Sequence, residues 1–223
     1  MSGFVELCAT TNFSFLRAAS HPEEYVERAG ELGYPGIGIA DRNTLAGMVR
    51  AHAKAKEMSA QAKEEGRSRN VRLAVGVRLV FRDGTPDIVV YPRDRAAYGR
   101  LTRLLTLGNK PAPKGECWLD FPMFLDYAEG QQAIVIPDLA PGALPDEKLR
   151  HTLLAVRQRC GRAWLAARFV FDGEDRRRLR MLSELAYETG ARLSVVQASA
   201  RASKEVDTGA RARVDTRHPS TPT

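Results

Sequence analysis

Short apolar segments alternate with amphipathic helical stretches along most of this chain, and this alternation restricts the fold more than any other feature. We predict strands over residues 5–9, 36–40, 71–81, 88–91, 133–136, 164–171 and 192–196. We predict helices over residues 22–32, 45–65, 93–107, 121–128, 147–159 and 174–189. Repeated strand–helix alternation predicts an α/β fold with a largely parallel sheet. A barrel and an open, doubly wound sheet both fit, because periodicity does not distinguish them.

The last segment, residues 197–223, differs in kind from the rest. It is rich in Ala, Arg, Ser and Thr, and its only large aliphatic residues are Val206 and Val214. Such a segment buries too little apolar area to offset the entropy of ordering. We therefore predict a domain over residues 1–196 and a disordered tail over 197–223. A basic arm for nucleic acid is the alternative reading of this tail.

Composition excludes several classes of protein. No apolar run approaches the ~18 residues of a membrane span, and the N-terminus lacks the pattern of a secretory signal. The three cysteines, Cys8, Cys117 and Cys160, are widely spaced and form no CxxC pair, which disfavours zinc fingers and disulfide frameworks. We expect a cytoplasmic protein with no membrane partner. A net charge of +7 suits contact with nucleic acid, although a merely basic surface explains it equally well.

Catalytic motifs are mostly absent. Hydrolytic metal sites need His, Asp or Glu residues that meet on one face of the fold. The chain has four histidines, His21, His52, His151 and His218, and none belongs to an HxH or DxH pair. Neither a GxSxG elbow, a Walker loop, HExxH nor GxGxxG is present. Cys8 has no histidine near it in sequence, so a buried structural cysteine is the better interpretation.

Several segments nevertheless resemble one family. ELCATTNFSFLRAASHPEE at residues 6–24 is similar to the opening of bacterial C-family DNA polymerases, and more narrowly to their error-prone branch. GIADRNTLAGMVRAH at 38–52 resembles a second motif of that family, and segments at 75–79, 89–108 and 114–117 continue the match. The resemblance runs to about residue 193. It implies a PHP domain (polymerase and histidinol phosphatase), a distorted β/α barrel of about seven strands with the last strand possibly incomplete.

Working PHP domains bind metals, so the resemblance allows each ligand position to be checked. The first motif is HxH in the family, whereas this chain has Cys8 and Thr10, and Arg17 stands where an acid follows. Asp41 matches the second motif, but Arg42 replaces its histidine, and Arg78 replaces a glutamate. The closing Asp-x-His is missing from residues 193–199. We therefore expect vestigial metal-site positions, no catalytic residue, and no bound metal or other cofactor.

Three of the substituted positions are arginines, which suggests that covalent positive charge replaces the metal. Arg17, Arg42 and Arg78 would then form ion pairs that close the barrel mouth. Because Asp41 and Arg42 are adjacent in sequence, Arg17 and Arg78 are the better partners for Asp41 or Glu6. The alternative is that each arginine simply faces solvent.

The palm, thumb, fingers and clamp-binding modules of the polymerase family are absent, so this chain alone is expected to be inactive as a polymerase. We expect a non-catalytic PHP-domain fragment, with DNA, the other polymerase modules and replication accessory proteins as partners in the full-length family. The tail reads like a frame-shifted coding region, so a truncated gene product is the simplest account. A stand-alone basic nucleic-acid-binding protein and a metal-dependent PHP phosphoesterase are the alternatives.

Overall fold

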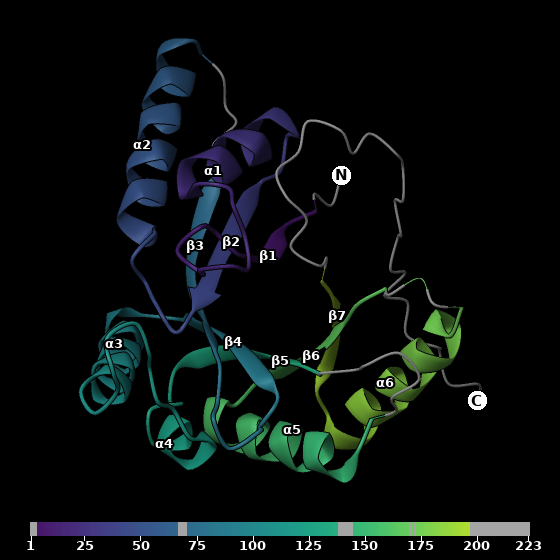
Figure 1. Cartoon of the computed structure of the whole chain (residues 1–223). Helices are drawn as coiled ribbons and strands as arrows, with labels where there is room; N and C mark the ends of the chain where they lie inside the picture. The colour runs from purple at the N-terminus through teal and green to yellow at the C-terminus, as the bar shows by residue number, and fades with distance from the viewer. Residues whose placement is uncertain (1–3, 67–70, 138–144, 170, 172, 197–223) are drawn as a thin grey trace.

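A computed structural model describes residues 4–66, 71–137, 145–169, 171 and 173–196. Strands and helices alternate as the sequence predicts (Figure 1). The strands are β1 (Glu6–Ala9), β2 (Gly36–Arg42), β3 (Arg72–Leu79), β4 (Asp87–Pro92), β5 (Gln131–Ile136), β6 (Ala163–Ala167) and β7 (Arg192–Val195). The helices are α1 (Pro22–Glu31), α2 (Met48–Glu64), α3 (Arg95–Asn109), α4 (Phe121–Asp126), α5 (Glu147–Cys160) and α6 (Asp175–Thr189).

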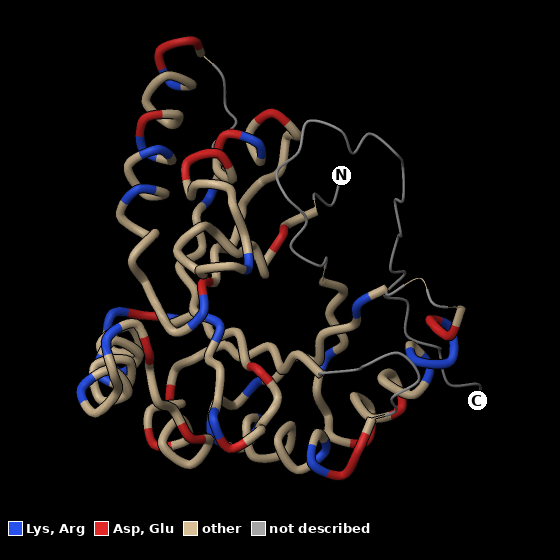
Figure 2. The backbone as a smooth tube through the Cα atoms, viewed as in Figure 1, with Lys and Arg blue, Asp and Glu red and all other residues tan. Residues whose placement is uncertain are grey.

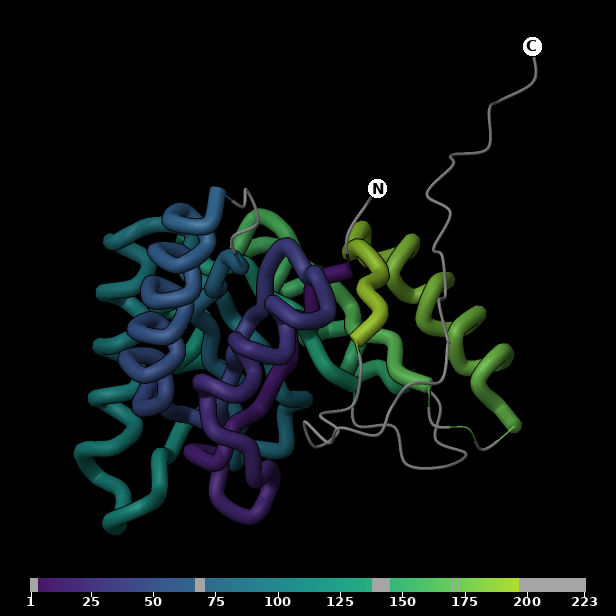
Figure 3. Tube along the Cα trace, turned by 90° about the horizontal axis from the view of Figure 1, so that it is seen from above, coloured from purple at the N-terminus to yellow at the C-terminus, as the bar shows by residue number. Residues whose placement is uncertain are grey.

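The strands form one seven-stranded sheet in sequence order, from β1 to β7. The β1–β2–β3 and β5–β6–β7 pairs are parallel, whereas β4 is antiparallel to both β3 and β5. The sheet curls, and the helices lie on its outer side (Figures 1 and 3). The predicted distorted, seven-stranded β/α barrel is therefore confirmed in its strands, with β1 and β7 as the edge strands of the described sheet.

Each face of the sheet has its own apolar cluster, because successive side chains of a strand point to opposite faces. The outer face of β1 and β2 packs on α1 and α2 through residues such as Ile37, Ile39 and Val26. The outer face of β3 to β6 packs on α3, α4, α5 and α6. The inner face carries a separate, smaller cluster of Cys8, Ala40, Val89, Tyr91, Ile134, Ala166 and Val196.

Tyr91 fills the inner face and explains the alternation of glycine and isoleucine in β2. A Cβ atom at Gly38 or Gly76 would overlap the Tyr91 side chain, so both positions need glycine. The Tyr91 hydroxyl donates a hydrogen bond to the carbonyl of Leu7 across the sheet. The side of the inner face near β1 is therefore packed with side chains, among them Tyr91 and Cys8.

Local differences from the prediction have physical causes. Asn43 and Thr44 precede the helix predicted over 45–65, but they do not cap α2, which begins at Met48 with Gly47 as its N-cap. Asn43 instead adopts a φ of 50° and extends the β2–β3 pairing, because its side chain exchanges two hydrogen bonds with the main chain of Val80. Strand β6 ends at Ala167 rather than at 171. In the described part of the chain no helix is long and apolar enough to cross a membrane.

Candidate functional site at the carboxyl ends of the strands

Strands β1, β2 and β3 bring most of the predicted site positions to one end of the sheet. Cys8 lies in β1, with Thr10 just beyond its end, Asp41 and Arg42 end β2, and Arg78 is near the end of β3. Arg42 and Arg78 are direct partners in the parallel register. The loop between β1 and α1 places Arg17 at the same end, where its charge helps to lower the pKa of the Arg42 guanidinium.

Asp41 is completely buried, and its carboxylate binds neutral donors from the β1–α1 loop. Oδ1 accepts from the Thr11 amide at 2.8 Å and from the Ser14 hydroxyl at 2.7 Å, and Oδ2 accepts from the Thr11 hydroxyl at 2.8 Å. The Ser14 oxygen in turn accepts from the Arg42 amide at 2.9 Å. Asp41 therefore fastens the loop to the end of β2.

Arg78 is predicted to pair with Asp41 or Glu6, but the observed ion pair joins it to Asp87. The Arg78 Nε donates to Asp87 Oδ2 at 2.7 Å, and the Arg42 Nη1 lies 3.5 Å from the same oxygen. Asp87 begins β4, and sequence reasoning missed it because the prediction compared only the family ligand positions. The β3–β4 hairpin could have revealed it, since its antiparallel strands return residue 87 to the neighbourhood of Arg78.

Positive charge exceeds negative charge around Arg42. Burial lowers the pKa of the Arg42 guanidinium, Asp87 opposes this shift, and Arg78 and Arg17 lower the pKa further. Arg17 is exposed and has no ion pair with another described residue. Arg42 and Arg78 therefore form ion pairs, as predicted, whereas Arg17 matches the alternative of an arginine that faces solvent.

The remaining positions do not fit a metal ion. Burial, with Glu6 as a smaller contributor, raises the pKa of the Cys8 thiol to about 12, so the free thiol is neutral at neutral pH. The Thr10 hydroxyl lies 3.4 Å from the Cys8 carbonyl. The Asp41 oxygens accept hydrogen bonds from Thr11 and Ser14, and the described residues contain no group of three or more His, Cys, Asp or Glu that could hold a metal ion.

The histidines lie elsewhere. His21 is the N-cap residue of α1, where its amide donates to Glu24 Oε2 at 2.8 Å in a capping box. His52 is exposed on α2, and His151 is exposed on α5, 3.1 Å from Glu147. His218 lies outside the described residues.

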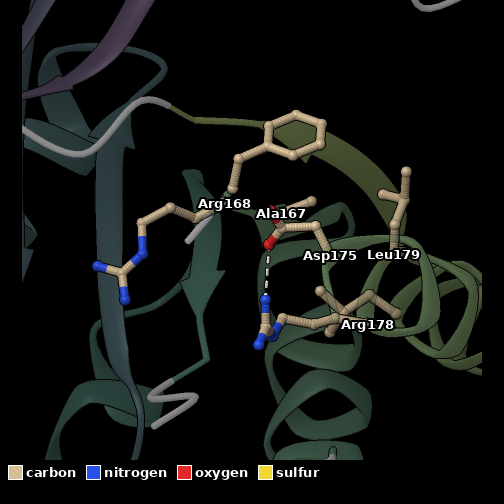
Figure 4. Close-up of a pocket in the computed structure, with 7 residues that line it drawn as sticks. Ala167, Arg168, Asp175, Arg178 and Leu179 are labelled. Carbon is tan, nitrogen blue, oxygen red and sulfur yellow. Dashed lines mark hydrogen bonds and ion pairs between the residues drawn. The ribbon is translucent and has the colours of Figure 1, made fainter. Parts of the chain in front are cut away.

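A small pocket lies between the end of β6 and α6 (Figure 4). Its lining is mostly apolar, and its two facing charged residues form an ion pair, since Arg178 Nη1 donates to Asp175 Oδ1 at 2.7 Å. Asp175 also accepts from the Phe171 amide, so the pair holds the start of α6. The Arg168 side chain points away from this pocket in Figure 4. The pocket therefore serves packing rather than chemistry.

Two solved structures share the fold. An amidohydrolase from Chromobacterium violaceum, described with bound sulfate and no metal, aligns with a TM-score of 0.60 over 95% of this chain and 92% of its own, at 13% identity. A metal-dependent phosphoesterase from Bifidobacterium adolescentis aligns with a TM-score of 0.56 over 94% and 91%, at 16% identity. These two likenesses concern the fold alone, which is a curled, seven-stranded sheet with helices on its outer side.

The particular family follows from sequence. The PHP domain model matches residues 7–159, and the chain belongs to this family. Error-prone DNA polymerases are similar to it: that of Caulobacter vibrioides is 46% identical over 84% of this chain, and that of Brucella abortus is 48% identical over 86%. The chain spans only 16% and 17% of the length of those two relatives.

Proposed function

We propose that this chain is the PHP domain of an error-prone DNA polymerase and that it acts as a structural module without hydrolytic activity of its own. The observation that carries the proposal is the identity of 46–48% with polymerases of that name across most of the chain. DNA synthesis in damage tolerance and repair would be performed by modules that lie outside this sequence. Those modules, DNA and replication accessory proteins are the proposed partners, in the cytoplasm.

The donor set supports the non-catalytic role. A hydrolytic PHP site needs several anionic or imidazole ligands around its metals. Here a neutral thiol, a hydroxyl and arginines stand at those positions, and Asp41 is engaged by Thr11 and Ser14. Arginine is always a cation, so it repels a metal ion rather than binding it.

The first experiment tests hydrolysis and metal binding on the full 223-residue chain. We expect no release of p-nitrophenol from p-nitrophenyl phosphate with added manganese or zinc, and less than one tightly bound metal per chain by elemental analysis. Two or more bound metals, or metal-dependent turnover, would contradict the non-catalytic role and favour the phosphoesterase alternative.

The second experiment tests the structural role. Residues 1–196 of this chain would replace the matching segment of the Caulobacter vibrioides polymerase, beside a variant in which that segment is deleted. We expect the chimera to extend a DNA primer and the deletion variant to lose activity. A chimera that folds but does not extend the primer would argue against the proposal. The proposed tail, residues 197–223, lies outside the described residues and is omitted from the chimera.

Direct binding of nucleic acid is the second candidate function, and α3 is the observation that favours it. Blue and red segments are mixed on α1 and α2, where Arg50 pairs with Glu23 (Figure 2). Helix α3 contains no acidic residue, and its exposed Arg95 and Arg103, with Lys110 beyond it, form no ion pair with another described residue. A steep fall of DNA affinity with salt, reduced in a triple Gln variant of these residues, would support this function.

A further inference from the structure

The inner face of the sheet places two arginines side by side. Arg42 and Arg78 are register partners on adjacent parallel strands, which lie about 4.8 Å apart. Both point to the inner face, because Ala40, two residues before Arg42, belongs to the inner cluster, and Gly76, two residues before Arg78, lies under Tyr91. Like charges in such a position repel each other, so the arrangement requires an anion.

Asp87 supplies only part of the negative charge that the two arginines require. Its Oδ2 atom serves both arginines, at 2.7 Å from Arg78 and at 3.5 Å from Arg42. A normal charge-assisted hydrogen bond between nitrogen and oxygen is about 2.7–2.9 Å long, so the contact with Arg42 is weak. Among the described residues, Arg17, Arg42 and Arg78 thus bring three guanidinium groups to this end of the sheet, and the one carboxylate of Asp87 pairs with two of them.

The two inward arginines are accessible from the mouth. The Arg42 and Arg78 side chains are each 30% exposed, and Arg17 is exposed on the loop between β1 and α1 at the same end of the sheet. That loop is held by the buried bonds of Thr11 and Ser14 to Asp41, so the position of Arg17 along the mouth is constrained. Guanidinium groups present planar forks of donors that match the oxygens of a phosphate group.

We propose that Arg17, Arg42 and Arg78 form a metal-free binding site for a phosphate group at the mouth of the barrel. The phosphate supplies the negative charge that Asp87 alone does not provide. It accepts hydrogen bonds from the guanidinium nitrogens that are not bonded to Asp87. The site binds without hydrolysing, since it has no group to activate water. This proposal stands independently of the polymerase assignment, because it rests on the geometry of this chain.

The experiment is titration calorimetry of the full chain with inorganic phosphate, in a chloride buffer of constant ionic strength. Arg42→Gln and Arg17→Gln are the test variants, and Arg103→Gln, which removes an exposed arginine of α3, is the matched control for net charge. We expect each test variant to weaken phosphate binding about tenfold or more, because a hydrogen bond to a charged group is worth at least ~1.4 kcal/mol. The control should bind like the parent.

The substitution Asp87→Asn should change the affinity for phosphate in the opposite direction. Loss of its carboxylate leaves the arginines without their competing partner, so phosphate should bind more tightly than in the parent chain. If this variant does not fold, Arg17→Gln still decides, because Arg17 is exposed and its loss removes no buried contact. Absence of binding to the parent, or equal binding by Arg42→Gln and Arg103→Gln, would overturn the proposal.

Two further probes identify the source of the phosphate. A trinucleotide with a 5′-phosphate and the same trinucleotide without it would compete with inorganic phosphate. Competition by the phosphorylated form alone would assign a terminal phosphate ester. Competition by neither would assign free phosphate. Equal competition by both, unaffected by Arg42→Gln, would place binding on a general basic surface and overturn the site.

Discussion

Two carboxylates at the same end of the sheet are neutralised in different ways. Asp41 is fully buried and accepts three hydrogen bonds from neutral donors of one short loop. Asp87 is partly exposed and binds the charged side chains of Arg78 and Arg42. The first arrangement fixes a loop through local geometry, whereas the second leaves an excess of positive charge.

The difference shows what the substitutions at the vestigial metal positions achieve. A buried carboxylate is costly unless its oxygens are hydrogen-bonded, and Thr11 and Ser14 meet that need without a cation. The arginines are therefore not required to neutralise Asp41. They are paired with a residue from another part of the sheet, which leaves them open to solvent at the mouth.

Among the substitutions that test this comparison, Asp41→Ala is expected to lower the free energy of unfolding the most. It leaves the Thr11 amide and the Thr11 and Ser14 hydroxyls without their acceptor in a buried site. Hydrogen bonds to charged groups contribute ~1.5–3 kcal/mol each, so we expect a loss of about 3 kcal/mol or more in the free energy of unfolding. Urea unfolding measures it.

Ser14→Ala is the matched control, because it keeps the carboxylate and removes one of its donors, together with the acceptor of the Arg42 amide. It should cost about 1–3 kcal/mol, less than Asp41→Ala. Equal midpoints for Asp41→Ala and the parent chain would show that the loop is not fastened through Asp41.

Arg78→Ala is expected to have an intermediate effect. Its partner Asp87 is the less exposed member of the pair, and solvent reaches both side chains. We expect a loss of about 1–2 kcal/mol, above the ~0–1 kcal/mol of an exposed pair and below the cost of breaking a fully buried one. Arg103→Ala should change stability by less than about 0.5 kcal/mol, as for a surface substitution without partners.

A salt titration separates the two carboxylates further. The Arg78–Asp87 contribution should shrink at high salt, because the pair is partly exposed, whereas the effect of Asp41→Ala should persist. If Arg78→Ala and Arg103→Ala unfold at the same urea concentration, Arg78 is a solvated surface residue and its bond to Asp87 contributes nothing.

Most of the fold could be predicted because each element carries its own local signal. The alternation of Gly and Ile at 36–40 marks β2, and the HPEE segment marks the start of α1. Element ends were less predictable. Asn43 resembled a helix cap, but its side chain bonds across to Val80, a partner 37 positions away that periodicity does not reveal.

The candidate site could be predicted only in part. Motif matching was enough to identify positions 8, 10, 17, 41, 42 and 78. They come together because parallel strands end at the same edge of the sheet. Their partners depend on side-chain packing between distant segments. Ser14 and Asp87 gave no signal in sequence, since a serine in a loop and an aspartate after a turn are common at such places.

The substitution Cys8→Ala is expected to have the smallest effect on stability. It tests whether the inner face of the sheet is closed to water at β1. Burial first, then Glu6, raises the pKa of its thiol from 9.0 to about 12, while Arg78 lowers it. The folded state therefore keeps a proton that the unfolded chain releases above pH 9. This stabilisation is complete below pH 9 and is lost as the pH rises toward 12.

Between pH 8 and pH 10 we expect the parent chain to lose about 1 kcal/mol more stability than Cys8→Ala, by urea unfolding. Because Cys117 and Cys160 are present in both chains, their own titration cancels in the comparison. The same loss in both chains would mean that the Cys8 thiol is as open to water in the folded state as in the unfolded one, and that the inner face is not closed at β1.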